Sequence, residues 1–274
     1  MINYVLYGDC RETLKQVDTK ARMCVTSPPY YGMRNYGGED NQLGMEQTPE
    51  EYVKNLVEVF REVRNCLTDD GTLWVNMGDS YYNYRPGKGQ ALVKQSVANS
   101  LRDQPTECAR RGNKLEGLKE KDLIGIPWML AFALRADGWY LRQDIIWSKP
   151  NPMPESMKDR CTKSHEYIFL LSKKQNYYFD VDAIKELTND GKSLKRKKSV
   201  WNVKTKPYKG AHFAVYPEEL ITSCILAGSE EKDTILDPFL GSGTTAMVAC
   251  NLNRYYIGCE LHKDYSSLIE SRVK

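Results

Sequence analysis

Residues 233–260 follow a pattern that restricts the chain to a small set of folds. They consist of an apolar strand, Thr234–Asp237, a loop with two glycines, a helix through about Leu252, and a second strand, Tyr255–Glu260. Two strands joined through a helix pair in parallel, and a parallel sheet needs helices on both faces to bury it. The sequence therefore predicts an α/β fold with a Rossmann-like, doubly wound and mostly parallel sheet.

The loop of this unit has features of a nucleoside site. Gly241 and Gly243 allow a tight turn and a close approach of the backbone to a ligand. Glu260 ends the second strand, where an acid can bind the hydroxyls of a ribose. The loop lacks a third glycine and a Lys-Ser/Thr ending, which disfavours NAD and ATP. An adenosyl ligand with an amino-acid tail fits better, with Phe239 covering it and Asp237 facing its ammonium. A purely structural turn is the alternative.

A second motif, Thr26–Tyr30, reads Thr-Ser-Pro-Pro-Tyr and follows the apolar run Met23–Val25. Proline has no backbone N–H and cannot continue a central strand. We therefore expect a strand to end here and to present Ser27, the proline carbonyls and Tyr30 at its carboxyl end. In an open α/β sheet that edge binds ligands. Taken alone, the motif is more typical of an ordinary turn with a surface tyrosine.

The rest of the chain alternates between strand and helix patterns. A strand from Tyr4 ends at Gly8-Asp9, so Asp9 is expected at the same sheet edge, where it can also cap the next helix. Thr48-Pro49 begins a long amphipathic helix, which Asp69–Gly71 is expected to end. The other expected elements are strands at 72–77 and 141–147, helices at 126–134 and 216–228, a last helix from residue 262, and an antiparallel pair of 166–171 with 177–179.

Positive charge is concentrated in two segments without regular patterns, 82–122 and 182–211, which we interpret as basic insertions. Residues 85–121 carry nine Lys/Arg against four Asp/Glu, and residues 185–210 carry nine against two, although the net charge of the chain is only +3. Such segments are typical of nucleic-acid binding, with solvated loops as the alternative. The candidates for phosphate contact are Lys195, Arg196, Lys197 and Lys198.

Cysteine and histidine are not arranged as metal ligands. The eight cysteines include no Cys-x-x-Cys pair, and there are only three histidines, so no metal is expected and the thiols should be reduced. No run approaches membrane-spanning length, and the first residues lack the regions of a signal peptide. We expect a cytoplasmic protein without a membrane partner.

The two motifs together resemble the S-adenosylmethionine-dependent DNA amino-methyltransferases. Thr-Ser-Pro-Pro-Tyr precedes Asp-Pro-Phe-Leu-Gly-Ser-Gly-Thr-Thr, which is the order of the circularly permuted β group of that family. The resemblance implies a permuted class I methyltransferase fold and a single catalytic domain over residues 1–274. Further segments look like family segments: Gly8–Cys10, Gly78–Ser80, Asp144–Asn151, Ser164–Tyr167 and His212–Pro217.

The resemblance also implies roles for individual residues. S-adenosylmethionine would be the cofactor, with Glu260 on its ribose hydroxyls and Asp9 on its adenine amino group. The cofactor loop would comprise Asp237, Phe239, Gly241, Gly243 and Thr244. The catalytic pocket would comprise Ser27, Pro28, Pro29 and Tyr30.

The chemistry explains why these residue types are needed. The lone pair of an exocyclic amine is delocalised into the base, and hydrogen bonds from its protons to Ser27 and to the Pro28 carbonyl would make the lone pair available. Tyr30 would stack on a base rotated out of the duplex. Ser27 at the first motif position resembles enzymes that methylate the 4-amino group of cytosine, whereas adenine 6-amino enzymes more often carry Asp or Asn there.

The expected function is therefore site-specific methylation of double-stranded DNA, with cytosine favoured and adenine as the nearest alternative. Methylation of RNA or of a protein amide, and a catalytically silent DNA-binding protein, are more distant alternatives. Enzymes of this kind work in the cytoplasm of prokaryotic or phage-infected cells. There they can accompany a cognate restriction endonuclease in a restriction-modification system.

Overall fold

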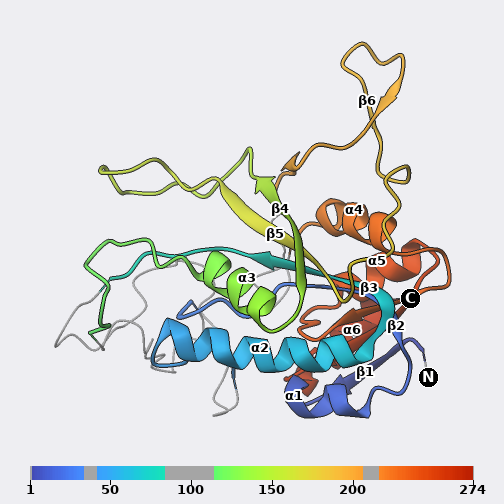
Figure 1. The fold of residues 1–274 in the computed structure, drawn as a ribbon, viewed down its shortest axis with the longest axis horizontal. Coiled ribbons are helices and arrows are strands. Elements are labelled where there is room, and N and C mark those ends of the chain that lie inside the picture. Colours follow the sequence, from blue (N-terminus) through green and yellow to red (C-terminus); the bar gives the residue numbers. More distant parts are fainter. Residues whose placement is uncertain (1, 34–41, 84–113, 206–215, 274) are drawn as a thin grey trace.

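The computed structural model describes residues 2–33, 42–83, 114–205 and 216–273, and it contains a large sheet with helices on both sides (Figure 1). Its eight strands lie in the order β1-β10-β9-β2-β3-β5-β4-β8. Their bounds are β1 Tyr4–Tyr7, β2 Ala21–Thr26, β3 Leu67–Met77, β4 Tyr140–Ser148, β5 His165–Ser172, β8 Val200–Asn202, β9 Thr234–Asp237 and β10 Tyr255–Glu260.

Every strand of this sheet except β5 runs in the same direction. The carboxyl ends of β2 and β9 are neighbours, since Met23 pairs with Ile235 and Cys24 pairs with Leu236. The opening unit, β1–helix–β2, is parallel as expected, but β10 and β9 lie between its two strands. The predicted doubly wound, mostly parallel sheet is confirmed.

The helices bury apolar side chains in two separate cores. Helices α1, α2 and α3 contribute to the first core, and α4, α5 and α6 contribute to the second. Cys24 faces the first core while Met23 and Val25 face the second, so the two cores cover opposite faces of the sheet. The bounds are α1 Cys10–Thr13, α2 Pro49–Cys66, α3 Ile126–Ala136, α4 Glu218–Gly228, α5 Thr244–Asn251 and α6 Ser266–Arg272.

Helix α2 begins as predicted but ends earlier. The hydroxyl of Thr48 accepts a hydrogen bond of 3.1 Å from the Glu51 N–H and caps the helix. The predicted stop at 69–71 is wrong, because α2 ends at Cys66 and β3 follows at once. Residues 68–71 bulge opposite the single residue Arg22, whose guanidinium binds the carboxylate of Asp70. These polar residues therefore lie within β3, at an irregularity of its pairing with β2.

The predicted antiparallel pair of 166–171 with 177–179 is wrong. Strand β5 has a strand on each side, so that Leu170 lies opposite both Trp74 of β3 and Gln143 of β4. Residues 177–179 instead reach the second core, where the ring of Phe179 stacks on Trp74 with centroids 6.0 Å apart. Partners distant in the sequence occupy both hydrogen-bonding edges of β5, and a local pattern does not reveal them.

The two basic segments are described only in part, because residues 84–113 and 206–215 lie outside the described residues. Within the second segment, β6 Glu186–Leu187 and β7 Leu194–Lys195 form a two-stranded ribbon that projects from the sheet (Figure 1). Strand β8 then joins the sheet beside β4 and buries Trp201, whose indole N–H donates to the Lys198 carbonyl at 2.7 Å. Of the family-like segment 212–217, only Tyr216 and Pro217 are described.

Candidate active site

The two predicted motifs meet at the carboxyl ends of neighbouring strands. Strand β2 ends at Thr26 and β9 ends at Asp237, and the Thr26 hydroxyl donates a hydrogen bond of 2.6 Å to Asp237 Oδ1. Ser27 follows and is partly exposed, whereas Pro28 is buried. The strand ends where the prolines remove its backbone donors. The catalytic motif is thus tied directly to the loop that follows β9.

Asp237 is 1% exposed, and four donors hold its carboxylate. Besides Thr26, the Phe239 N–H donates to Oδ1 at 3.0 Å, and the hydroxyls of Tyr216 and Thr245 donate to Oδ2. Burial raises the pKa of Asp237, and these hydrogen bonds offset part of the rise. A carboxylate has about four acceptor positions, so protein groups engage this one fully. The part played by Tyr216 was not predicted.

Glu260 is buried beside the loop with the two glycines. Its Oε2 accepts a hydrogen bond of 2.8 Å from the Gly241 N–H, and its Oε1 accepts one of 2.9 Å from the His262 N–H. Burial raises the pKa of Glu260, and the backbone hydrogen bonds lower it in part. Gly241 and Gly243 have φ angles of +55° and +83°, which L side chains rarely adopt. The tight turn at this loop is therefore built on glycine.

The loop also offers a buried hydroxyl. Thr244 is the first residue of α5, and its Oγ1 is buried without a hydrogen-bond partner in the described part of the chain. A buried hydroxyl without a hydrogen bond costs free energy, unless a bound ligand supplies the missing partner. Phe239 lies partly exposed in the same loop. With the Glu260 carboxylate, these residues fit a nucleoside that carries a polar amino-acid tail.

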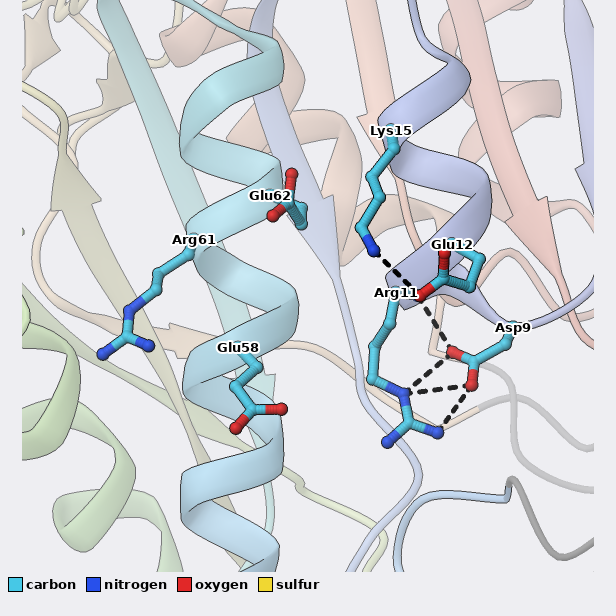
Figure 2. Close-up of a pocket in the computed structure, with 7 residues that line it drawn as sticks. All are labelled: Asp9, Arg11, Glu12, Lys15, Glu58, Arg61 and Glu62. Atoms are coloured by element: carbon cyan, nitrogen blue, oxygen red, sulfur yellow. Dashed lines mark hydrogen bonds and ion pairs between the residues drawn. The ribbon is translucent and has the colours of Figure 1, made fainter.

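Asp9 follows β1, whose Tyr7 pairs with Glu260 in the sheet. Its carboxylate caps α1, as predicted, by accepting from the Arg11 N–H at 2.9 Å, and it also binds the Arg11 guanidinium. Burial alone would raise the pKa of Asp9, but hydrogen bonds and charge from Arg11 outweigh it and lower the pKa. Figure 2 shows this pair in an open polar pocket between α1 and α2. The pocket is lined by Asp9, Arg11, Glu12, Lys15, Glu58, Arg61 and Glu62.

Tyr30 belongs to a polar cluster that was not predicted. Its hydroxyl donates to Glu166 Oε2 at 2.8 Å and lies 3.4 Å from the Ser27 hydroxyl. Glu166 also forms an ion pair with Lys149 and accepts a hydrogen bond of 3.2 Å from Asn76 Nδ2. Burial, and then the charge of Glu166, raise the pKa of Tyr30 well above its usual value. Because β4 ends and β5 begins at this edge, both partners of the ion pair reach the motif.

One sign of this cluster is visible in the sequence. Lys149 and Glu166 lie in two of the segments that look like family segments, but no role followed from that likeness. Their positions depend on the antiparallel pairing of β4 and β5, in which Ser148 lies opposite His165.

Two neighbours fix the position of the motif. Tyr52 of α2 donates its hydroxyl to the Pro29 carbonyl at 2.7 Å. Gly78 lies against the Tyr30 ring, and an added Cβ there would be 2.8 Å from Tyr30 Cε2 and 3.3 Å from Glu166 Cδ. A side chain at Gly78 would therefore displace the Tyr30 ring.

The four residues predicted to contact DNA lie on and just after β7, at the projecting ribbon (Figure 1). Arg196 and Lys198 are exposed, and Lys195 is partly exposed. Lys197 forms an ion pair of 3.0 Å with Glu186 of β6. Strands β3, β5 and β4 separate β2 from β8 in the sheet, so this cluster does not join the catalytic motif.

The described residues contain no group of three or more His, Cys, Asp or Glu side chains that could hold a metal ion. In the same residues, no helix has both the length and the apolar character needed to cross a membrane.

Comparison with known proteins gives a consistent result. The N6/N4 DNA methylase family matches residues 21–271, which include both motifs but not Asp9. The Type II methyltransferase M.SmaI of Serratia marcescens is 50% identical over 272 residues, which cover 98% of this chain and 90% of that protein. The structure of PvuII DNA methyltransferase, described as cytosine-N4-specific, has a TM-score of 0.70 at 18% identity and matches 100% of this chain and 87% of its own. The M1.HpyAVI–SAM complex has a TM-score of 0.62 at 18% identity over 100% of both chains.

The family match covers most of the chain, and the relatedness to M.SmaI extends over nearly all of it. The two solved structures share the fold. The glycine turn at Gly241 and Gly243 and the buried Glu260 lie within the matched region. The chain belongs to the N6/N4 family of S-adenosylmethionine-dependent DNA amino-methyltransferases.

Proposed function

We propose that this protein, as a single catalytic domain, methylates the 4-amino group of cytosine at specific sites in double-stranded DNA. The observation that carries the proposal is the hydrogen bond of 2.6 Å from Thr26 to Asp237, which joins the catalytic motif to the cofactor loop. Ser27 supports cytosine, because serine at this position resembles the enzymes that act on the cytosine amine. PvuII methyltransferase, which has the same fold, is described as cytosine-N4-specific.

S-adenosylmethionine supplies a methyl group on a sulfonium, which is already activated toward a nucleophile. Glu260 would accept hydrogen bonds from the ribose hydroxyls, and Thr244 Oγ1 would bind the polar tail. Phe239 would cover the adenosyl group, and Asp9 would contact the adenine amine. Asp237 would hold the loop in shape and add negative charge near the ammonium, since its own acceptor positions are engaged by the protein.

The pocket has to make a weak nucleophile reactive and to place it in line with the methyl group. Ser27 Oγ and the Pro28 carbonyl would accept hydrogen bonds from the two protons of the amine, which favours a pyramidal nitrogen with an available lone pair. Tyr52 already engages the Pro29 carbonyl, which favours Pro28 for this role. Tyr30 would stack on the flipped base. Positioning can then contribute much of the remaining rate.

Methylation of the 6-amino group of adenine is the second candidate. The family that matches this chain contains both N6 and N4 enzymes. The same acceptor pair could bind either amine. The choice therefore depends on whether the pocket fits the single ring of cytosine or the double ring of adenine.

Double-stranded DNA is proposed as the acceptor, with its phosphates on Lys195, Arg196, Lys197 and Lys198 of the second basic segment. M.SmaI is named as a Type II methyltransferase. By analogy we propose a cognate restriction endonuclease as a partner in a restriction-modification system.

Labelled S-adenosylmethionine, offered with duplex DNA, with RNA and with a protein mixture in separate reactions, tests the proposal. We expect label in DNA alone and, after digestion to nucleosides, in N4-methyldeoxycytidine. Label in N6-methyldeoxyadenosine would favour the second candidate. Label in RNA or protein without label in DNA would contradict the proposal.

A further inference from the structure

The ion pair between Lys149 and Glu166 lies beside the catalytic motif without a role in the mechanism above. The two side chains are 17% and 15% exposed, and Lys149 Nζ lies 4.2 Å from the centroid of the Trp147 ring. Removing charged side chains partly from water costs free energy unless each charge is paired. Glu166 is paired on both oxygens, since Oε1 binds Lys149 and Oε2 accepts from Tyr30 and Asn76.

These contacts fix the direction of a chain of hydrogen bonds. The carboxylate of Glu166 faces the Lys149 ammonium and the Asn76 amide nitrogen, which only donate, and it therefore acts as an acceptor. A phenol has a single proton, and the Tyr30 hydroxyl is 2.8 Å from Glu166 but 3.3 Å from Asn76 Oδ1, so it donates to Glu166. The Tyr30 oxygen can then accept from Ser27 Oγ, which lies 3.4 Å away.

We propose that Glu166 is a positioning residue that acts through Tyr30 to make Ser27 an acceptor toward the target base. With its proton directed at Tyr30, the Ser27 hydroxyl offers lone pairs to the pocket. An amine, which donates, is bound by this arrangement, whereas a carbonyl at the same position of the base is rejected. The inference rests on the proposed function. It adds that this chain of hydrogen bonds makes the pocket select a base with an amine over a base with a carbonyl.

Glu166→Gln tests the chain because its amide nitrogen can donate to the Tyr30 oxygen. The Tyr30 proton is then free to turn toward Ser27, and the Ser27 proton toward the base. Tyr30→Phe breaks the same chain while it keeps the aromatic ring and the Lys149–Glu166 pair. A role of Glu166 limited to neutralising Lys149 would involve neither the Tyr30 hydroxyl nor the polarity of Ser27.

The first measurement is binding to two duplexes that differ at one base. One contains a site that the wild-type protein methylates, and the other has a carbonyl in place of the target amine, such as uracil for cytosine. We expect wild type to prefer the amine duplex, and the preference to fall about tenfold in Glu166→Gln and in Tyr30→Phe. The double variant should show no further fall, because both changes break one chain.

The second measurement is methyl transfer under saturating S-adenosylmethionine. Glu166→Gln should lower kcat about tenfold or more, with the KM for S-adenosylmethionine unchanged. Asp233→Asn is the matched control, because Asp233 pairs with Arg22 at the opposite edge of the sheet and both side chains are 22% exposed. This control should retain both the duplex preference and kcat.

The outcomes separate this inference from the proposed function. If wild type methylates DNA but the duplex preference is the same in Glu166→Gln, the inference is overturned and the proposed function stands. Additive losses in the double variant would likewise overturn it. Absence of transfer to any DNA by wild type would overturn both.

Discussion

The hydroxyl of Thr26 donates a hydrogen bond of 2.6 Å to the carboxylate of Asp237, across 211 positions of the sequence. Thr26 immediately precedes Ser27, which would accept a hydrogen bond from the target amine. Asp237 begins the loop that would hold the methyl donor. Both side chains are buried, with exposed fractions of 0% and 1%. The two walls of the proposed pocket are therefore joined directly, and the reaction depends on their relative placement.

Thr26→Val removes this hydrogen bond and keeps the shape of the side chain. We expect the free energy of unfolding to fall by about 1.5–3 kcal/mol, because a buried carboxylate loses a donor. Denaturant unfolding measures the loss. Thr68→Val is the control, since the Thr68 hydroxyl is buried without a partner among the described residues and its removal should be nearly neutral. Equal losses of unfolding free energy in the two variants would show that the Thr26–Asp237 hydrogen bond does not stabilise the fold.

Ser27→Ala should lower turnover about 10²–10³-fold, because an acceptor aimed at the reacting amine is lost. The affinity for S-adenosylmethionine should stay nearly constant, since Ser27 faces the base and not the cofactor loop. Calorimetric titration and single-turnover transfer measure the two quantities. Ser271→Ala, an exposed change on α6, controls for the substitution itself. A parallel loss of cofactor affinity would contradict the placement of Ser27.

Glu260→Gln tests the ribose contact through its pH dependence. The pKa of Glu260 is raised by burial, so the folded protein holds this proton to higher pH than the unfolded chain does. Its contribution to the free energy of unfolding must therefore fall as pH rises through that pKa. Ligand hydroxyls donate to the ionised carboxylate, so the affinity for S-adenosylmethionine should instead rise over the same range.

We expect Glu260→Gln to weaken binding of S-adenosylmethionine about tenfold or more near pH 8, and to flatten the rise of affinity with pH. The pKa of Asp237 is also raised, so the difference between the wild-type and variant curves is the quantity that reports Glu260. Calorimetric titrations over a series of pH values supply it. Identical pH slopes for the two proteins would exclude Glu260 from the ligand contact.

Gly78→Ala places a Cβ within 2.8 Å of the Tyr30 ring. The ring must move, and transfer should fall about tenfold or more because small displacements in an active site are costly. Gly228→Ala is a matched control, because its Cβ would be 2.8 Å from Met23 Sδ in the second core. We expect both variants to lose stability by about 1–3 kcal/mol, measured by denaturant unfolding. A specific loss of rate should occur only at Gly78, and equal rates would contradict the role of the ring.

The basic cluster after β7 should determine part of the salt dependence of DNA binding. Replacing Lys195, Arg196 and Lys198 by Gln should lower the slope of log K against log salt by about 0.9 for each phosphate contact that is lost. Lys197→Gln alone should change the slope least, because Lys197 is paired with Glu186. Lys232→Gln, an exposed change before β9, is the control. An unchanged slope in the triple variant would remove this cluster from the DNA contact.

The parts of the fold that depend on local sequence could be predicted. The unit from β9 to β10 and the capped start of α2 follow from glycine, proline and capping chemistry within a few residues of each element. The stop of α2 could not be predicted, because residues 68–71 lie in a strand whose partner, β2, is distant in the sequence. The ribbon of β6 and β7 and the edge strand β8 are too short to show a pattern.

The same distinction holds at the site. Glu260 could be placed at the carboxyl edge of the sheet because it ends a recognisable strand, and Ser27 because it directly follows one. The partners of Tyr30 could not, since Asn76, Lys149 and Glu166 come from β3, the end of β4 and β5, and meet only through the pairing of those strands. Tyr216 reaches Asp237 from a position two residues before the start of α4, without any strand pairing among the described residues to announce it.

Nucleoside mass spectrometry of duplex DNA, incubated with the protein and S-adenosylmethionine, decides whether this protein methylates the 4-amino group of cytosine. A parallel reaction with Ser27→Ala links any product to the catalytic motif. We expect N4-methyldeoxycytidine with the wild-type protein and a strongly reduced amount with the variant. Failure of the wild-type protein to form any methylated base, or equal product with both proteins, would contradict this expectation.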